Sequence, residues 1–298
     1  MQWVELSLSC NSEQVEAISA ILGKYGQGGA LIEEWPSQQN ADKHFTVKIY
    51  LPLSRAYPAI LAEIETQVSQ AGYTHRPLER ILQQDEWFDS LKKNFKVMEI
   101  GQSFVIKPTW ISTPLNYPGR HIIEVDPGAA FGTGLHPTTR LCISSLEKHL
   151  IPGTAVLDLG TGTGILAIAA AKLGAAKVVA LDIDKVAVRT ASFNIKNNQV
   201  DDKVEVKKGT LSRAFQSKNR AVFNLVIANI TSRAISDFSD ALMEVLKPEG
   251  VLIVSGIHPE GLDEVLIRLA ISNLKLMSIE IEQDWHAVIA CKETLPEK

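Results

Sequence analysis

The sequence predicts an α/β fold in which a doubly wound parallel sheet follows a smaller α+β domain. From residue 155 onward, short apolar runs alternate with helical patterns, as they do in βαβ units. The first 83 residues instead follow the order β-α-β-β-α-β, which suggests a ferredoxin-like domain. A chain of 298 residues is long enough for both.

Alternation, a capping residue and glycines define the first elements. Trp3 to Ser9 alternates apolar and polar residues, which is typical of a half-buried strand. Asn11 is expected to cap a helix that ends near Gly23 and Gly26 and carries an apolar stripe of Val15, Ile18, Ile21 and Leu22. Further along, the pattern predicts strands over residues 29–35 and 45–51, a helix over 57–70 and a strand over 73–82.

A connecting segment of residues 84–119 is predicted between a domain of residues 1–83 and a domain of residues 120–298. It begins with a short helix over residues 85–94, on which Trp87 and Leu91 share one face. We expect these two side chains to pack in a core.

The larger domain is predicted from strands that are apolar throughout. Strands are expected over residues 155–159, 178–181, 204–207 and 225–228, with helices from Ile165 and over residues 185–197. Continuous apolar strands are typical of a parallel sheet covered on both faces. Ligands of such sheets bind at the carboxyl ends of the strands, so the residues after each strand are the candidate site.

The segment TAVLDLGTGTG carries the strongest chemical signal. Gly160, Gly162 and Gly164 allow a tight turn and a close backbone approach to a ligand at the next helix. A dinucleotide is one candidate ligand, because Gly162, Gly164 and Ala167 match G-x-G-x-x-[GA]. Asp158 favours S-adenosylmethionine instead, because a carboxylate repels a pyrophosphate but can hold the ammonium group of this methyl donor.

Polar side chains also follow two other strands. Asp182 lies about 20 residues beyond the glycines and is expected to bind the ribose hydroxyls, while Asp184 can cap the following helix. Asn229 ends the fourth strand, where it either caps a turn or accepts a hydrogen bond from a substrate amine. We expect it to orient that amine beside the sulfonium methyl group.

The glycine-rich loop AFGTGLHPTT leads into a helix that should begin near Pro137. Such loops either form ordinary turns or bind and cover ligands. Phe131 and Thr133 are expected at the donor, and Phe131 and Leu135 would exclude water. His136 is a candidate general base, with gating as its alternative role. No histidine or cysteine stands at ligand spacing from it, so no metal is expected.

Composition restricts the class of protein further. The chain is 45% hydrophobic and 21% charged, has no apolar run of membrane-spanning length and no signal-peptide pattern at its start, so a cytoplasmic protein is expected. Cys10, Cys142 and Cys291 are too scattered for a disulfide framework and should be buried, reduced thiols. The formal net charge of −4 disfavours nucleic acid and suits a basic protein partner. Phe45 and Tyr50 also lack the aromatic signature of RNA-binding strands.

The segments VDPGAAFGTGLHPTT, LDLGTGTGILAIAAAKLGAAKVVALDID and VIANI together resemble the methyltransferases of ribosomal protein L11. The resemblance is strong from Asp85 to about Gly256. It implies a class I methyltransferase domain, S-adenosylmethionine as donor, a substrate-recognition domain at the N-terminus, and repeated methylation of lysine and N-terminal amines. The turn is GTGTG where the family commonly has G-C-G-S-G, and Leu91 stands where a second tryptophan is common.

The same resemblance implies donor contacts at Thr139, Gly160, Asp182 and Asn229. We expect a monomer that does not bind nucleic acid or membranes directly. The alternatives are a methyltransferase of another protein or of RNA, a dinucleotide-dependent oxidoreductase, and a non-catalytic ribosome-associated protein. Methyl transfer to lysine requires a neutral amine, although the unperturbed pKa of lysine is about 10.4.

Overall fold

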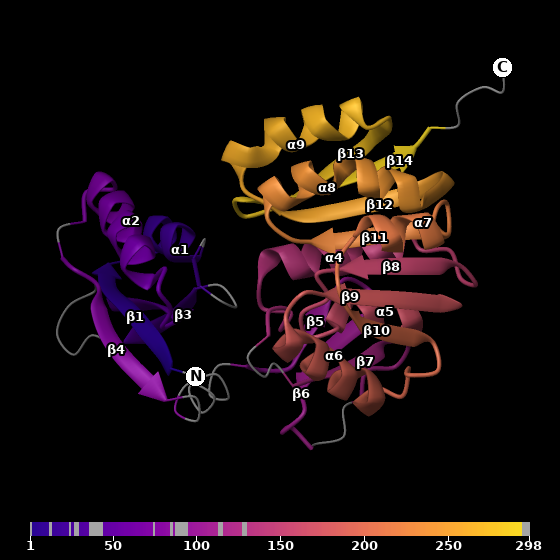
Figure 1. The fold of residues 1–298 in the computed structure, drawn as a ribbon. Helices are drawn as coiled ribbons and strands as arrows, with labels where there is room; N and C mark the ends of the chain where they lie inside the picture. Colours follow the sequence, from indigo (N-terminus) through magenta and orange to yellow (C-terminus); the bar gives the residue numbers. More distant parts are fainter. Residues whose placement is uncertain are drawn as a thin grey trace. The chain divides into compact units, whose positions relative to one another are not determined.

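The structure is a computed structural model that describes residues 2–11, 14–23, 25–26, 30–35, 44–73, 75–83, 86, 95–112, 116–126 and 130–293. The chain divides into two compact units, Met1–Lys96 and Val97–Lys298 (Figure 1). The predicted helix over residues 85–94, with Trp87 and Leu91, lies outside the described residues apart from Glu86.

The first unit has the predicted order of a ferredoxin-like domain. Its elements are β1 (Gln2–Asn11), α1 (Val15–Gly23), β2 (Leu31–Trp35), β3 (His44–Pro52), α2 (Tyr57–Gln70) and β4 (Leu78–Gln83). The strands form an antiparallel sheet in the order β2-β3-β1-β4. Alternate residues of β1 point into a core shared with both helices, which therefore cover the same face; this core includes Val4, Leu6, Leu8, Ile18, Leu22, Ile64 and Val68.

In the first unit the predicted cap of α1 is confirmed, whereas the predicted start of the last strand is wrong. Asn11 caps α1 as predicted: its Oδ1 accepts a hydrogen bond from the Gln14 amide at 3.0 Å. The last strand, predicted from Tyr73, begins only at Leu78. Pro77 precedes it and cannot donate a backbone hydrogen bond, and the Tyr73 hydroxyl instead donates to the Ser9 carbonyl.

The main sheet of the second unit is doubly wound. Its strands are β8 (Ala155–Leu159), β9 (Lys177–Asp182), β10 (Val204–Lys208), β11 (Phe223–Asn229), β12 (Leu246–Ile257), β13 (Leu274–Glu282) and β14 (Trp285–Lys292). The order is β10-β9-β8-β11-β12-β14-β13, parallel through β12. The antiparallel strands β13 and β14 at one edge were not predicted from the sequence.

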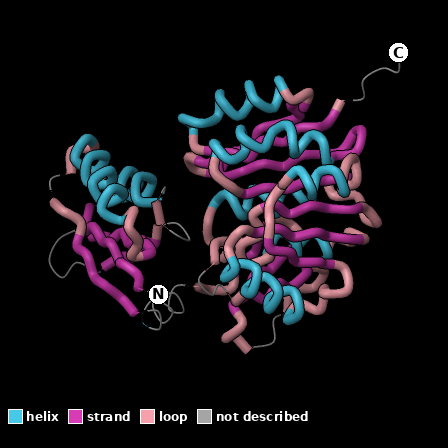
Figure 2. The backbone as a smooth tube through the Cα atoms, in the orientation of Figure 1, coloured by secondary structure: helices cyan, strands magenta, loops and turns pink. Residues whose placement is uncertain are grey.

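Helices cover both faces of this sheet (Figure 2). One group of successive, mutually packed helices consists of α4 (Pro137–His149), α5 (Ile165–Lys172) and α6 (Lys185–Asn197). The other consists of α7 (Arg213–Lys218), α8 (Ser232–Val245) and α9 (Pro259–Ile271). The strand order reverses between β8 and β11, and this reversal is where a doubly wound sheet binds its ligand.

A small sheet of β5 (Met98–Ile100), β6 (Phe104–Pro108) and β7 (His121–Val125) also belongs to the second unit. Every residue of β6 is buried, and β7 packs against α5 and α6. β5 and β6, which lie within the predicted connecting segment, therefore belong to the second unit. The division between the two units falls between residues 96 and 97.

The sequence also predicts no membrane-spanning helix and three buried cysteine thiols. Within the described ranges, no helix combines the length and the apolar character that crossing a membrane requires. Cys10 and Cys142 are buried free thiols, as expected, whereas Cys291 is only partly buried.

Candidate active site

The glycine turn between β8 and α5 is hydrogen-bonded to the end of β9. The Gly160 and Thr161 amides donate to the Leu181 carbonyl at 2.8 and 3.0 Å. The Gly162 amide donates to Asp182 Oδ2 and the Asp184 amide to Asp182 Oδ1, both at 2.9 Å. The half-buried Asp182 carboxylate thus stands beside the turn, and each of its oxygens can accept a further hydrogen bond.

At two of the predicted glycines, neighbouring segments of the chain leave no space for a side chain. A Cβ on Gly162, where φ is +57°, would lie 2.2 Å from the Phe131 carbonyl oxygen. A Cβ on Gly160 would lie 2.6 Å from Cγ2 of Ile230, next to Asn229. The turn is therefore packed closely between the glycine-rich loop and the end of β11, in addition to any approach by a ligand.

Asp158 is completely buried at the end of β8, directly under this turn. Its Oδ2 accepts a hydrogen bond from the Thr161 hydroxyl at 2.6 Å, while Oδ1 has no hydrogen-bond partner among the described residues. Burial is the main cause that raises the pKa of the carboxyl to about 7; hydrogen bonds from the Thr161 hydroxyl and the Ala167 amide act against it, and the negative charge of Asp182 acts with it. A buried carboxylate with an unpaired oxygen is a suitable partner for a cationic ligand group.

The glycine-rich loop is fastened to the turn by main-chain and side-chain hydrogen bonds. The Thr163 amide donates to the Phe131 carbonyl at 2.8 Å, and the Thr163 hydroxyl donates to the Gly132 carbonyl. Asn194 of α6, which is fully buried, donates to the Asp126 and Thr163 carbonyls at 2.9 Å each. Asn194 was not predicted from the sequence, although a polar residue on the buried face of an amphipathic helix can indicate such a role.

His136, Thr138 and Asn229 form a chain of hydrogen bonds. His136 caps α4, because its Nδ1 accepts from the Thr138 amide at 3.3 Å. Nδ1 is thus an acceptor, so the Thr138 hydroxyl, 2.7 Å away, donates to it. That hydroxyl in turn accepts from Asn229 Nδ2 at 3.1 Å. This chain fixes the orientation of the Asn229 carboxamide and leaves its Oδ1 as the acceptor for another partner.

Thr139 and Thr133 complete the predicted set. Thr139 is fully buried, and its Oγ1 has no hydrogen-bond partner within the residues that the structure describes. Thr133 is also buried, and its Oγ1 accepts from the Leu135 amide at 3.3 Å. The unpaired atoms of Thr139 and Asp158 fit a polar ligand that binds at the turn, since buried polar groups are normally hydrogen-bonded.

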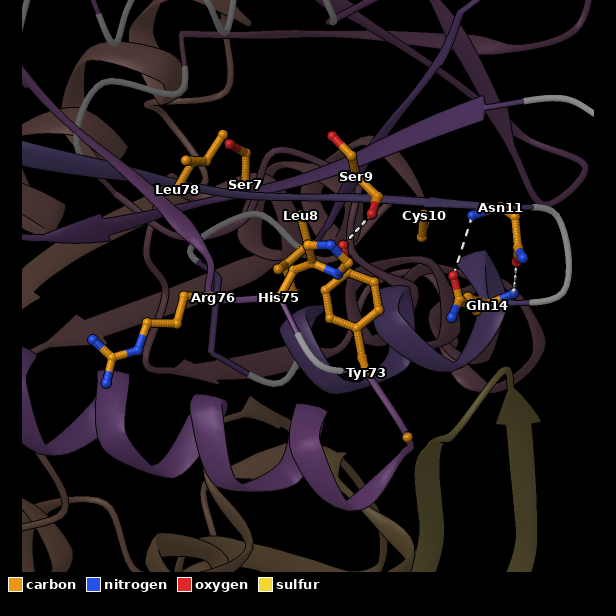
Figure 3. A pocket seen from close by; sticks show the side chains of 11 residues that line it. Ser7, Leu8, Ser9, Cys10, Asn11, Gln14, Tyr73, His75, Arg76 and Leu78 are labelled. Carbon is orange, nitrogen blue, oxygen red and sulfur yellow. Dashed lines mark hydrogen bonds between the residues drawn. The ribbon is translucent and has the colours of Figure 1, made fainter.

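The first unit contains a separate cleft of about 520 Å³. β4 begins opposite Ser7, so residues 8–11 of β1 have no strand beside them on that side. Figure 3 shows the Tyr73 and His75 side chains beside this part of β1, with Arg76 pointing away from them. The ring centroids of Tyr73 and His75 are 5.5 Å apart. None of the predicted site residues lines this cleft.

Strand order, the glycine turn after β8, the acidic residue that ends β9 and the asparagine that ends β11 together define the second unit as a class I methyltransferase domain. The sequence family described as ribosomal protein L11 methyltransferase (PrmA) matches residues 2–293. The chain belongs to this family.

Similar proteins agree with this assignment. The ribosomal protein L11 methyltransferase of Chloroflexus aurantiacus is 36% identical, over 96% of this chain and 97% of its own. The protein of the same name from Brevibacillus brevis is 36% identical, over 98% of this chain and 100% of its own. A crystal structure of the ribosomal protein L11 methylase of Lactobacillus delbrueckii subsp. bulgaricus is similar with a TM-score of 0.61 at 30% identity, over 67% of this chain and 100% of that one.

Proposed function

We propose that this protein transfers methyl groups from S-adenosylmethionine to lysine and N-terminal amines of ribosomal protein L11. The observation that carries the proposal is the carboxamide of Asn229. It is held by the Thr138 hydroxyl, lies next to the glycine turn proposed to bind the methyl donor, and has an oxygen that can accept a hydrogen bond. Membership of the ribosomal protein L11 methyltransferase family supports the same substrate. When bound, S-adenosylmethionine supplies an electrophilic methyl group on a sulfonium.

The residues around the glycine turn suit this donor. Asp182 offers a half-buried carboxylate for the ribose hydroxyls, and Asp158 offers a buried carboxylate oxygen for the ammonium group. Thr139 adds an unpaired buried hydroxyl. Phe131 and Thr133, in the loop fastened over the turn, would cover the donor and exclude water. A dinucleotide would instead place its pyrophosphate near two carboxylates, which repel it.

Asn229 is the residue that orients the amine. Its Oδ1 can accept a hydrogen bond from a neutral amine and so direct the nitrogen lone pair toward the methyl group. A neutral amide does this without the charge attraction by which a carboxylate would stabilise the protonated, unreactive amine. The acceptor amine loses its proton before transfer, to solvent or to a group at the entrance of the site.

His136 supports this arrangement as a positioning residue. Nδ1 accepts from both the amide and the hydroxyl of Thr138, so this nitrogen is engaged in the helix cap and is not the atom that would take a proton from the substrate. The interaction with Thr138 instead holds the hydroxyl that binds Asn229. This role agrees with gating or alignment of the loop better than with general base catalysis.

Substrate recognition is assigned to the first unit. The residues proposed to bind the donor and align the amine all lie in the second unit. The first unit folds around its own core and carries the cleft beside β1. We therefore expect the ferredoxin-like unit to choose the protein and the second unit to carry out the reaction.

Transfer of a labelled methyl group tests the proposal directly. Purified ribosomal protein L11, the other proteins of the large subunit and ribosomal RNA are each incubated with the enzyme and labelled S-adenosylmethionine. We expect label on ribosomal protein L11, and mass spectrometry should locate it on lysine and N-terminal amines. Label on RNA, or on a different protein only, would contradict the proposed substrate. Calorimetry with NADH in place of the methyl donor should detect no binding.

A further inference from the structure

Four ring side chains from three separate segments of the second unit contact one another in a row. The ring centroids of Phe131 and His136 are 5.4 Å apart, those of His136 and Trp285 4.8 Å, and those of Trp285 and His258 5.7 Å. All three contacts are edge-to-face, with interplanar angles of 62°, 67° and 82°. Such contacts add stability beyond the burial of apolar area and fix the ring orientations.

The row begins with Phe131 at the glycine turn, and the sheet topology places Trp285 and His258 on the opposite side of Asn229. β8, which leads to the turn, flanks β11 on one side, and β12 flanks it on the other. His258 directly follows the end of β12, and Trp285 begins β14, whose next residue pairs with Ile257. The turn and Phe131 therefore lie on the side proposed for the donor, and the rings of Trp285 and His258 lie on the side from which an acceptor would approach Asn229.

The row is held in place by charged and polar contacts around it. Arg140 of α4 donates from Nε to Glu282 at 2.6 Å and also binds the Leu135 carbonyl. Glu282 is the last residue of β13 and pairs with Trp285 across a tight turn. This contact connects the glycine-rich loop with the turn that presents the tryptophan, so the rings are positioned before any ligand arrives.

Burial differs along the row in a way that suits a binding wall. His136 is buried in the middle of the row, whereas Phe131 and Trp285 are only half-buried and the His258 side chain is 20% exposed. The Glu282 carboxylate, next to Trp285, is already paired with Arg140. The faces of aromatic rings attract ammonium groups, and trimethylammonium groups are their best-known ligands. This attraction does not require an N–H donor on the cation.

We propose that Trp285, flanked by His136 and His258, is an aromatic wall beside Asn229 that holds the ammonium group formed by each transfer, in its mono-, di- and trimethylated forms. Each methylation removes an N–H donor, so hydrogen bonds alone hold the amine less well after every transfer. A ring face keeps its attraction for the cation throughout. The wall would thus retain partly methylated amines for further transfer. This inference rests on the proposed function, because it requires an amine acceptor.

A binding measurement on the wild-type protein tests the wall without any substitution. Two peptides are compared by calorimetry in the presence of S-adenosylhomocysteine: one carries trimethyllysine, and the other carries its uncharged isostere with carbon in place of the quaternary nitrogen. An aromatic wall should bind the cation between about twofold and thirtyfold more tightly. Equal affinity, tighter binding of the neutral peptide, or no detectable binding of either would overturn the proposal.

Product distributions provide a second test on the full chain. Trp285→Leu should release mono- and dimethylated ribosomal protein L11 where the wild type proceeds further, while Trp285→Phe should stay close to the wild type because it keeps a ring. Affinity for S-adenosylmethionine should be unchanged in both variants, which also shows that they are folded. A wild-type product distribution in Trp285→Leu would contradict the wall. If the wild type fails to methylate ribosomal protein L11 but still prefers the cationic peptide, the proposed substrate is wrong and the wall stands.

Discussion

The two units of this chain use their sheets in opposite ways. In the second unit, parallel strands are covered on both faces, and polar groups gather at the carboxyl edge, where Thr139 and Asp158 each keep a buried atom without a hydrogen-bond partner among the described residues. In the first unit, an antiparallel sheet has helices on one face, and Leu78 and Ile81 on β4 are 70% and 58% exposed.

This difference indicates two kinds of ligand. Buried, unpaired polar atoms beside a tight turn suit a small molecule that becomes enclosed and satisfies them. An exposed strand with apolar side chains, next to a cleft of mixed polar and apolar lining, is more typical of a surface that meets another protein. The division of labour between donor binding and substrate choice can therefore be tested one unit at a time.

The largest expected effect separates the two units completely. A chain that begins at Val97 keeps β5, β6 and β7, and with them the whole of the second unit. It should bind S-adenosylmethionine with the affinity of the full chain, by calorimetry, and should transfer no detectable methyl group to ribosomal protein L11. A truncated enzyme that modified this protein at the full-length rate would end the proposal that the first unit selects the substrate.

The next largest effect concerns the alignment of the amine. Asn229→Ala should lower kcat and kcat/KM together by a factor on the order of 100, because it removes a positioned hydrogen bond needed chiefly in the transition state. Asn229→Asp should recover only part of this rate, since a carboxylate favours the protonated amine. Steady-state kinetics and calorimetry distinguish the roles. Lost donor binding with unchanged turnover at saturating donor would make Asn229 a donor contact instead.

Removal of the Asp182 carboxylate should weaken donor binding without a comparable effect on turnover. Asp182→Ala should cost about 1.5 to 3 kcal/mol of affinity for S-adenosylmethionine, the usual scale for hydrogen bonds to a charged group. Asp184→Ala is the matched control: it removes an exposed helix cap, bonded to the Val186 amide at 2.9 Å, and should affect stability only. Equal donor affinities for the two variants would show that the ribose contact is misassigned.

The smallest expected effect is a dependence of donor affinity on pH. Burial raises the pKa of Asp158 to about 7, so its carboxyl takes up a proton as the pH falls through that value. Only the ionised form can hold the donor ammonium, so affinity should fall by about eightfold between pH 7.5 and pH 6 for a single group of this pKa. Asp158→Asn is uncharged throughout and should bind weakly with little pH dependence. If donor affinity depended on pH as steeply in Asp158→Asn as in the wild type, Asp158 would not be the group responsible.

Local patterns in the sequence predicted much of the second unit. The strand of residues 155–159 and the helix of residues 185–197 have the predicted bounds, because continuous apolar runs, glycines and capping residues act over a few neighbouring positions. Asp184 caps its helix for the same reason. Antiparallel β13 and β14 were missed because their two-residue turn, Gln283-Asp284, lacks the glycine that marks most such hairpins, and because β14 meets β12 only in the folded chain.

The supporting residues of the site were also beyond local patterns. Asn194 binds Asp126 from 68 residues away, and Thr138 meets Asn229 across 91 residues. The sequence pointed to Thr139 in the same motif, but it gave no sign that the preceding hydroxyl would orient the asparagine. Trp285 likewise reaches His136 only through the folded chain. These contacts follow from tertiary packing, whereas the glycine turn and its acidic residue lie within one βαβ unit.

The intact mass of ribosomal protein L11 from cells with and without this protein tests the central claim most directly. The same cells should also be supplied with either the wild type or the Asn229→Ala variant. The account predicts that ribosomal protein L11 is heavier by whole methyl increments when the wild type is present, and that it is unmodified or largely so in the deletion and with the variant. An unchanged mass of ribosomal protein L11 in the deletion would contradict the account.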